Sequence, residues 1–383
     1  MTRVAVSREM FSWAIERSGR TLDSLRERFP KLLEWQEGRA LTLRQLERFA
    51  QVTATPLGYL FLERPPVEIL PVPEFRTVRQ TRARRPSADL LEIVYTMQRR
   101  QAWMREYLIG EGTEPLTFVD SARLEDSSQS VAGRICEALH LERNWATVCG
   151  TWSEALRQLR QAMEKAGILV VASSVVGNNT HRKLDVEEFR GFVLIDDFAP
   201  LVFVNAADAR AAQMFTLAHE LAHVWFGRSA AFDLRQMQPA DETTEQASNR
   251  VAAEFLVPES ALQQAWPTAR QDPEPFQAIA RQFKVSALVA ARRVLDLGLV
   301  RKAQFLEFYQ AYLKDERRKE ARVTEGGDFY ATQGLRVSRR FARAVIQAAR
   351  EGKLLYREAY ELTGLYGKTF EAFASRLEKA GSP

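Results

Sequence analysis

The sequence is poor in cysteine and histidine. Of its 383 residues only two are cysteine, Cys136 and Cys149, and four are histidine. Two cysteines so far apart form neither a disulfide framework nor a paired-cysteine metal knuckle. No apolar run reaches the roughly 18 residues that a membrane helix needs, and the N-terminus lacks the apolar stretch of a secretion signal. We therefore expect a cytoplasmic protein that does not associate with membranes.

The composition is that of an ordinary globular protein. Hydrophobic residues make up 46% of the chain and charged residues 27%, which excludes disordered, collagen-like and coiled-coil classes. At about 100–200 residues per domain, the length predicts two to four domains. The net charge of +5 is locally concentrated, because residues 74–105 hold eight arginines and three acids. This segment can pair with phosphates or with an acidic partner, or it can be a solvated linker and helix face.

The first 63 residues contain the capping and helix-ending residues expected of four or five short helices. Ser7, Thr21 and Thr42 are expected helix caps, and Gly19 and Gly38 are expected helix ends. The segments TLDSLRERF, WQEGRALTLRQLERFA and TPLGYLFL resemble the XRE-type helix-turn-helix fold. This resemblance implies a module that binds DNA.

The expected third helix argues against DNA recognition by this module. The turn before Pro30 is short, and the next helix begins with Lys31, Leu32, Leu33 and Glu34. Leucine cannot hydrogen-bond a base edge and glutamate repels phosphate, whereas a recognition helix needs polar side chains there. We expect the module to dock a protein or to be structural, with DNA binding as the alternative.

The next part of the chain changes from linker to helices and then to strands. RPPVEILPVPEF (64–75) holds four prolines in twelve residues, which predicts a stiff spacer. Residues 88–109 and 121–166 are expected to be helical. After them, ILVVASSVV is rich in β-branched residues, and GFVLI with LVFVN (201–205) predicts a hairpin.

The most informative segment follows this hairpin. It contains His219-Glu220-Leu221-Ala222-His223, an HExxH motif in a strongly apolar helical context. His219 and His223 lie one turn apart on the same helix face, so both imidazoles can bind one Zn²⁺ ion. Glu220 can reach a zinc-bound water as a general base. A chance match on a buried helix is the alternative.

A catalytic zinc site needs a third protein ligand, and no histidine follows His223. The candidates are the acids of DETTEQASNRVAAEFLVP (241–258): Asp241, Glu242, Glu245 and Glu254. Glu245 is favoured because it shares an otherwise small or apolar helix face with Asn249. Glu254 is the rival candidate, and it could instead hydrogen-bond to a metal ligand without binding the metal itself.

The motif and its surroundings resemble the ImmA/IrrE family of zinc metallopeptidases. The resemblance rests on FRGFVLIDDFAPLVFVN, AAQMFTLAHELAHVWFG, EQASNRVAAEFLVP and IARQFKVSALVAARRVLDLGLV (279–300). It implies a zincin-like metallopeptidase core with a small sheet, so the expected fold class is α+β and mainly helical, with flanking helix-turn-helix-like modules. It also implies that His219 and His223 are zinc ligands, Glu220 the catalytic base and Glu245 the third ligand.

Two functions are compatible with this resemblance. The first is a zinc-dependent endopeptidase that cleaves a regulatory protein, such as a repressor or a toxin-antitoxin or mobile-element partner. The second is a non-hydrolytic transcriptional regulator or antitoxin with a latent protease domain. His181 and Arg182, in an expected loop, are the nearest polar candidates for stabilising the oxyanion, although a lone histidine in a loop is more often a surface residue. LVFVN could offer its edge to an extended peptide.

The remaining sequence is mainly helical. LEFYQAYLKDERRKEARVTEGG (306–327) predicts a helix that ends in a charge run, and the last segment predicts helix, glycine turn and helix. This region is expected to be a helical cap or a dimerisation element, with nucleic-acid contact as the alternative. We divide the chain into an XRE-like module, a Pro/Arg-rich linker, a helical segment, the metallopeptidase core and a helical C-terminal region, at residues 1–63, 64–87, 88–166, 167–300 and 301–383.

Overall fold

A computed structural model describes residues 3–66, 68, 86–227, 242–314 and 329–379. Its contacts divide the chain into two units, 1–71 with 80–96 and 72–79 with 97–383. The helix α5 (Ala88–Gly110) contributes to both units. Five of the eight clustered arginines lie in 76–85, outside the described residues. Among the residues described, no helix is long and apolar enough to cross a membrane.

The first unit contains the predicted short helices. They are α1 (Arg8–Arg17), α2 (Leu22–Arg28), α3 (Leu32–Gln36), α4 (Leu43–Val52) and the 3-10 helix η1 (Leu57–Phe61). The three predicted caps are confirmed, because the side chains of Ser7, Thr21 and Thr42 accept the backbone N–H groups of Met10, Ser24 and Gln45. A short antiparallel pair, β1 (Arg3–Val4) with β2 (Leu41–Thr42), joins the N-terminus to the start of α4.

In the second unit, the segment 121–166, which was expected to be helical, contains three separate helical elements. They are α6 (Ser128–Ala138), the 3-10 helix η2 (Trp145–Val148) and α7 (Trp152–Lys165). His140 takes a left-handed φ of 52° after α6, and Thr151 caps a new helix by accepting the N–H of Glu154 at 3.1 Å. These two residues therefore lie between α6 and α7, where one helix ends and the next begins.

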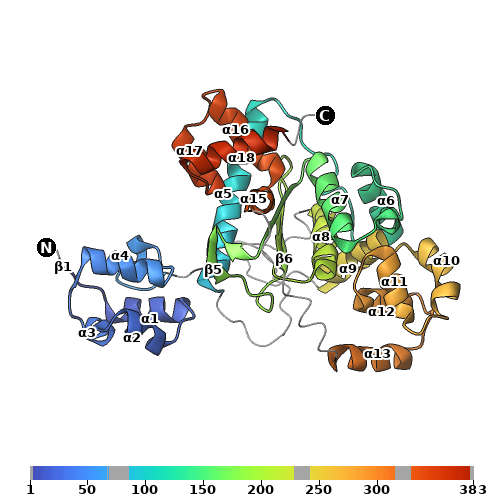
Figure 1. Ribbon diagram of the computed structural model, residues 1–383, viewed down its shortest axis with the longest axis horizontal. Coiled ribbons are helices and arrows are strands. Elements are labelled where there is room, and N and C mark those ends of the chain that lie inside the picture. Colours follow the sequence, from blue (N-terminus) through green and yellow to red (C-terminus); the bar gives the residue numbers. More distant parts are fainter. Residues whose placement is uncertain (1–2, 67, 69–85, 228–241, 315–328, 380–383) are drawn as a thin grey trace. The chain divides into compact units, whose positions relative to one another are not determined.

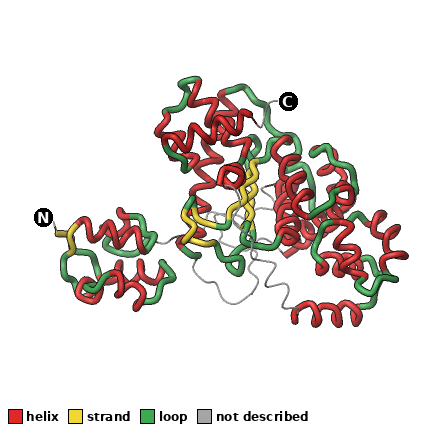
Figure 2. The backbone as a smooth tube through the Cα atoms, viewed as in Figure 1, coloured by secondary structure: helices red, strands yellow, loops and turns green. Residues whose placement is uncertain are grey.

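A three-stranded sheet lies at the centre of this unit (Figures 1 and 2). Its order is β3 (Leu169–Ser173), β7 (Leu201–Asn205) and β6 (Gly191–Leu194). β6 and β7 are antiparallel, which confirms the predicted hairpin, and β3 runs parallel to β7. The expectation that LVFVN offers an open edge was wrong, because this strand is β7 and has a neighbour on each side.

The segment expected to be a loop around His181 is also a strand. β5 (Asn179–Lys183) pairs antiparallel with β4 (Val175–Val176) to form a separate small hairpin. Its side chains are largely exposed, including that of His181. The turn that joins the two strands contains Gly177, whose φ of 55° is in the left-handed region that glycine tolerates.

Helices cover the three-stranded sheet. α8 (Arg210–Phe226) packs on β6, β7 and the following helix α9 (Glu242–Leu256). The core continues through the later helices, which are α10 (Glu259–Ala269), α11 (Pro275–Phe283), α12 (Ala287–Asp296) and α13 (Lys302–Lys314). The fold class is therefore α+β and mainly helical, as predicted.

Four helices complete the C-terminal region, and Figure 1 shows three of them grouped together above the sheet. They are α15 (Phe329–Val337), α16 (Arg339–Arg350), α17 (Tyr356–Thr363) and α18 (Gly367–Lys379). α15 packs against β3. Arg100 on α5 is 7% exposed and donates to the carbonyls of Leu362 and Arg336 at 2.9 and 2.8 Å. This arginine of the basic segment is therefore structural.

Candidate metal centre

The HExxH motif lies in the second half of α8. The flanking apolar residues are buried as expected, and Trp225 and Leu221 are at most 1% exposed. His219, Glu220 and His223 are themselves only 2%, 7% and 7% exposed. Burying three polar side chains in an apolar helix is costly unless they have partners. These side chains therefore need hydrogen-bond partners or a bound ion.

Glu245 of α9 is one of these partners. Its Oε2 lies 3.2 Å from Nε2 of His219 and its Oε1 lies 3.0 Å from Nε2 of His223. The two Nε2 atoms are 3.1 Å apart. Among the residues described, these three form the one group of histidine, cysteine and acidic side chains that could hold a metal ion.

The spacing of these donors fits zinc. Ligands about 2.0–2.1 Å from one tetrahedral zinc ion lie about 3.3 Å from each other. The distance of 3.1 Å between the two Nε2 atoms is close to this value. The two imidazole-to-carboxylate distances of 3.2 and 3.0 Å are similar, and they run to different oxygens of Glu245. Two imidazole nitrogens and one carboxylate oxygen also leave one tetrahedral position for a water or a substrate.

The protonation of Glu245 suits the same role. Burial alone would raise the pKa of this carboxyl group, but the hydrogen bonds and charges of His219 and His223 outweigh burial. They hold the pKa of Glu245 well below its ordinary value. The side chain is therefore an ionised oxygen donor at neutral pH.

Ser248 was not found from the sequence. It is fully buried on α9, and its Oγ lies 3.5 Å from Nδ1 of His223. Such a contact orients the imidazole ring and fixes which nitrogen faces the metal. A signal was present, because Ser248 follows Glu245 by three residues and therefore shares its helix face.

Gly191 is a second residue that the sequence did not reveal. A Cβ atom at this position would lie 2.5 Å from Cγ2 of Thr216, 2.8 Å from the carbonyl oxygen of Phe203 and 3.7 Å from Cγ of Glu220. The absence of a side chain therefore lets the edge strand β6 pack closely against α8, directly beside Glu220.

Glu254, the rival candidate for the third ligand, does not join this group. Glu254 forms an ion pair with Arg293 of α12 and accepts the N–H of Glu259 at 3.3 Å. Asp241 lies outside the described residues, and the side chain of Glu242 is not described although α9 begins there. His181 is not part of the group either.

Comparison with protein families agrees with this geometry. Residues 163–295, from the end of α7 to α12, match the peptidase M78 model, which is described as the IrrE N-terminal-like domain. This part of the chain belongs to that family. The IrrE-like domain therefore has a zincin-like metallopeptidase fold, which confirms the resemblance recognised in the sequence.

The C-terminal region matches a different family. Residues 337–376, which span α16 and α17 and most of α18, match a domain of unknown function (DUF8813). Searches of curated proteins and of solved structures found no match. The family comparison thus supports a metallopeptidase-type domain at residues 163–295.

Proposed function

We propose that this protein is a zinc-dependent endopeptidase that cleaves a regulatory protein. The observation that carries the proposal is the convergence of His219, His223 and Glu245 in an IrrE-like domain, beside the buried Glu220. In this proposal His219, His223 and Glu245 are the zinc ligands. A purely structural zinc site would be closed by a fourth protein ligand and would not need Glu220.

The proposed chemistry divides between the metal and the protein. A zinc ion in this site supplies Lewis-acid chemistry. Glu220 takes the proton from the attacking water and later delivers it to the leaving amine. Because Glu220 is 7% exposed, its carboxylate is shielded from bulk solvent and its interactions are strengthened accordingly.

The proposed substrate-binding element is the edge strand β6. Within the described part of the sheet, β6 has a neighbouring strand on one side, β7. An extended peptide can add to such an edge through backbone hydrogen bonds. Gly191 places the strand beside Glu220, and Gln101 of α5 donates to the carbonyl oxygen of Leu194 at 2.8 Å, at the other end of the strand. A peptide on β6 would therefore pass the general base.

The proposed substrate class follows from the flanking modules. A repressor or a toxin-antitoxin partner would be recognised outside the cleft, and we propose that the N-terminal module docks it. Leu33 is 43% exposed at the start of α3, and Glu34 pairs with Arg39. An exposed leucine beside a neutralised acid suits a protein contact better than a phosphate contact.

The proposal is tested with the full chain and the regulatory protein that the neighbouring gene encodes. We expect the wild-type protein to cleave this partner, and Glu220→Gln to retain zinc while losing about 10²–10⁴-fold in rate. Cleavage is measured by mass spectrometry of the products. A stable complex that remains uncut with zinc bound would instead favour the non-hydrolytic regulator.

A further inference from the structure

The start of α16 concentrates positive charge in an unusual place. Residues 336–350 contain five arginines and no acid. Two of them, Arg339 and Arg340, lie in the first turn of α16, where the helix dipole is positive and cations are disfavoured. An arrangement that opposes the dipole in this way needs a nearby anion.

Four arginines at this place define what we call the arginine patch: Arg160 of α7 and Arg339, Arg340 and Arg343 of α16. None of them forms an ion pair or a side-chain hydrogen bond with another residue in the described ranges. The Nε atoms of Arg160 and Arg340 are enclosed without an acceptor. Enclosed polar atoms in proteins nearly always have a partner, so each of these two Nε–H groups could still donate to one.

The one acid in this neighbourhood is already engaged. Glu164, one turn after Arg160 on α7, accepts a hydrogen bond from Oγ of Ser338 at 2.6 Å and one from the backbone N of Arg340 at 3.4 Å. Its carboxylate thus caps α16. Burial lowers the pKa of Arg160 to about 10. Glu164 interacts electrostatically with Arg160, Arg339 and Arg340, so one carboxylate shared by three guanidinium groups leaves an excess of two positive charges.

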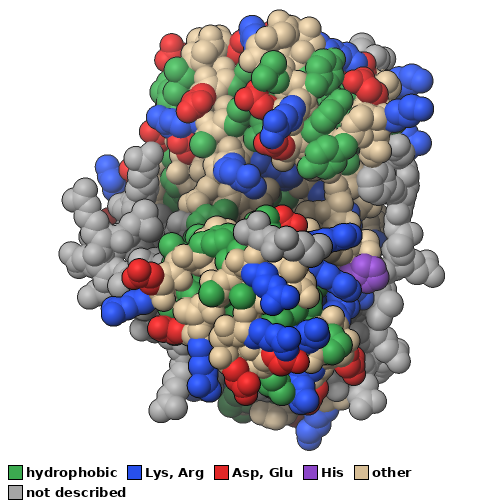
Figure 3. Space-filling model, turned by 90° about the vertical axis from the view of Figure 1, so that its left-hand side faces the viewer, with side chains coloured by type: hydrophobic (Ala, Val, Ile, Leu, Met, Phe, Trp, Pro, Cys, Tyr) green, Lys and Arg blue, Asp and Glu red, His purple; other side chains and the backbone are tan. Residues whose placement is uncertain are grey.

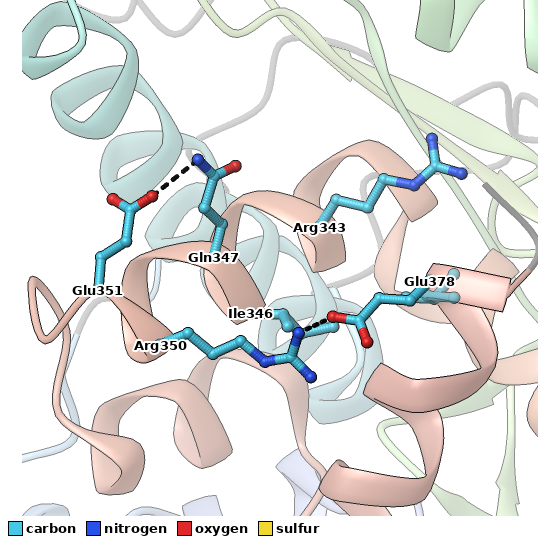
Figure 4. A pocket seen from close by; sticks show the side chains of 7 residues that line it. Arg343, Ile346, Gln347, Arg350, Glu351 and Glu378 are labelled. Carbon is cyan, nitrogen blue, oxygen red and sulfur yellow. Dashed lines mark hydrogen bonds and ion pairs between the residues drawn. The ribbon is translucent and has the colours of Figure 1, made fainter. Parts of the chain in front are cut away.

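The groove farther along α16 does not share this excess. It has a volume of about 630 Å³ and is lined by residues of α16 and α18 (Figure 4). Within it Arg350 pairs with Glu378, and Gln347 donates to Glu351 at 2.9 Å. Figure 4 shows Arg343 extending away from both pairs. Arg343 lines the edge of this groove and lies three to four residues after Arg339 and Arg340 on the same helix face, so it also borders the arginine patch.

The excess of positive charge at the arginine patch is not shared by the surface shown in Figure 3. On the face shown in Figure 3, lysine and arginine side chains are interspersed with aspartate and glutamate. Such a mixed surface produces no strong field of one sign. The arginine patch differs because Arg160, Arg339 and Arg340 share a single acid, Glu164, and are partly enclosed.

We propose that the arginine patch binds a phosphate group, carried by a nucleotide or by the backbone of a nucleic acid. Guanidinium groups form paired, charge-assisted hydrogen bonds with phosphate oxygens. A phosphate carries more than one negative charge and several acceptors, so it matches the excess of positive charge better than a single carboxylate does. Arg160 and Arg340 have no enclosed Nη atoms, so their outer nitrogens are open to a ligand arriving from solvent.

The test measures binding of three probes to the full-length protein over a range of salt concentrations. The probes are inorganic phosphate, ATP and a fluorescent 20-base-pair DNA duplex of arbitrary sequence. The variants are Arg340→Gln and Arg343→Gln, and the matched control is Arg357→Gln, which removes an equal charge from an 89% exposed side chain on α17. Thermal unfolding of each variant checks that it is folded.

We expect at least one probe to bind, and both patch variants to weaken that binding while Arg357→Gln leaves it unchanged. For DNA, each patch variant should reduce the salt slope by about 0.9. Binding of ATP or phosphate alone identifies a small ligand, and binding of the duplex alone identifies a nucleic acid. If no probe binds at low salt, or if the control loses as much as the patch variants, the proposal is wrong. If Arg340→Gln does not fold, the exposed Arg343→Gln decides.

Discussion

Glu245 and Glu254 lie on the same helix, α9, and have opposite environments. Glu245 faces two imidazoles, with contacts of 3.0 and 3.2 Å to His223 and His219. Glu254 faces the guanidinium group of Arg293, whose Nε also donates to the carbonyl oxygen of Val257 at 3.1 Å. Glu254 is therefore neutralised by an arginine of the protein itself, whereas Glu245 meets two side chains that are potential metal ligands.

The comparison shows how a metal ligand differs from a structural carboxylate. A buried carboxylate with its own arginine is satisfied, and it holds α9 to α12 without any further cation. A carboxylate that shares a small space with two imidazole nitrogens brings together three lone-pair donors, which are stable together when a cation lies between them. The predictions below test this difference.

The largest effect is expected at the two histidines. His219→Ala or His223→Ala should abolish stoichiometric zinc binding, because two ligands remain from a set of three. His181→Ala is the matched control, since this histidine is exposed on β5, and it should retain one zinc per chain. Elemental analysis of the purified proteins checks this. Full zinc in a folded His219→Ala protein would contradict the site.

Substitutions of the two glutamates should have different effects on zinc affinity and on stability. Glu245→Gln should weaken zinc binding by more than about 100-fold, beyond the effect expected for a residue that only supports a ligand. Glu254→Gln should change zinc affinity far less but should destabilise the fold by about 3–5 kcal/mol, because Arg293 remains buried without its partner. Chelator competition and urea unfolding measure the two effects. The reverse order in the chelator titration would assign the ligand to Glu254.

A smaller effect is expected where β6 meets α8. Gly191→Ala should destabilise the protein by about 1–3 kcal/mol, as overpacking does, because its Cβ would lie 2.5 Å from Thr216 and 2.8 Å from the backbone of Phe203. Gly177→Ala is a useful comparison, since nothing lies within 4 Å of a Cβ there and the strain is that of its φ alone. If Gly191→Ala binds as much zinc as the wild-type protein but has lower peptidase activity, the substitution acts on strand β6 and not on the metal ligands.

The smallest effect is expected at Ser248. Ser248→Ala should weaken zinc binding by about 10-fold, at the low end of the range for residues that orient a ligand, because its contact with Nδ1 of His223 is long at 3.5 Å. The same chelator competition measures it. An effect as large as that of Glu245→Gln would mean that Ser248 does more than orient the ring.

The sequence predicted the elements of this site better than their connections. The HExxH spacing placed two imidazoles on one face of α8 because helical geometry is local. Choosing between Glu245 and Glu254 was harder, since the partner of Glu254 is Arg293, which lies 39 residues later and belongs to another helix. Likewise, hydropathy identified the hairpin but not that β3 would add beside β7, because strand order is set by long-range packing.

The helical regions show the same limit. Capping residues predicted the starts of α1, α2 and α4, because a cap acts within three residues. The end of α6 is followed by His140 in a left-handed conformation, and no pattern of apolar residues predicts such a conformation. The arginine patch could not be predicted either, since Arg160 and Arg340 are 180 residues apart.

The most direct test of the account is X-ray absorption at the zinc edge of the zinc-loaded wild-type protein. The site predicts a first coordination sphere of nitrogen and oxygen at about 2.0–2.1 Å, with the outer-ring signature of two imidazoles. After the same zinc loading and removal of free metal, His219→Ala should show no stoichiometric zinc absorption edge. A sulfur ligand at about 2.3 Å would contradict the account, because it would place the zinc on Cys136 or Cys149, both of which are buried and free in this structure.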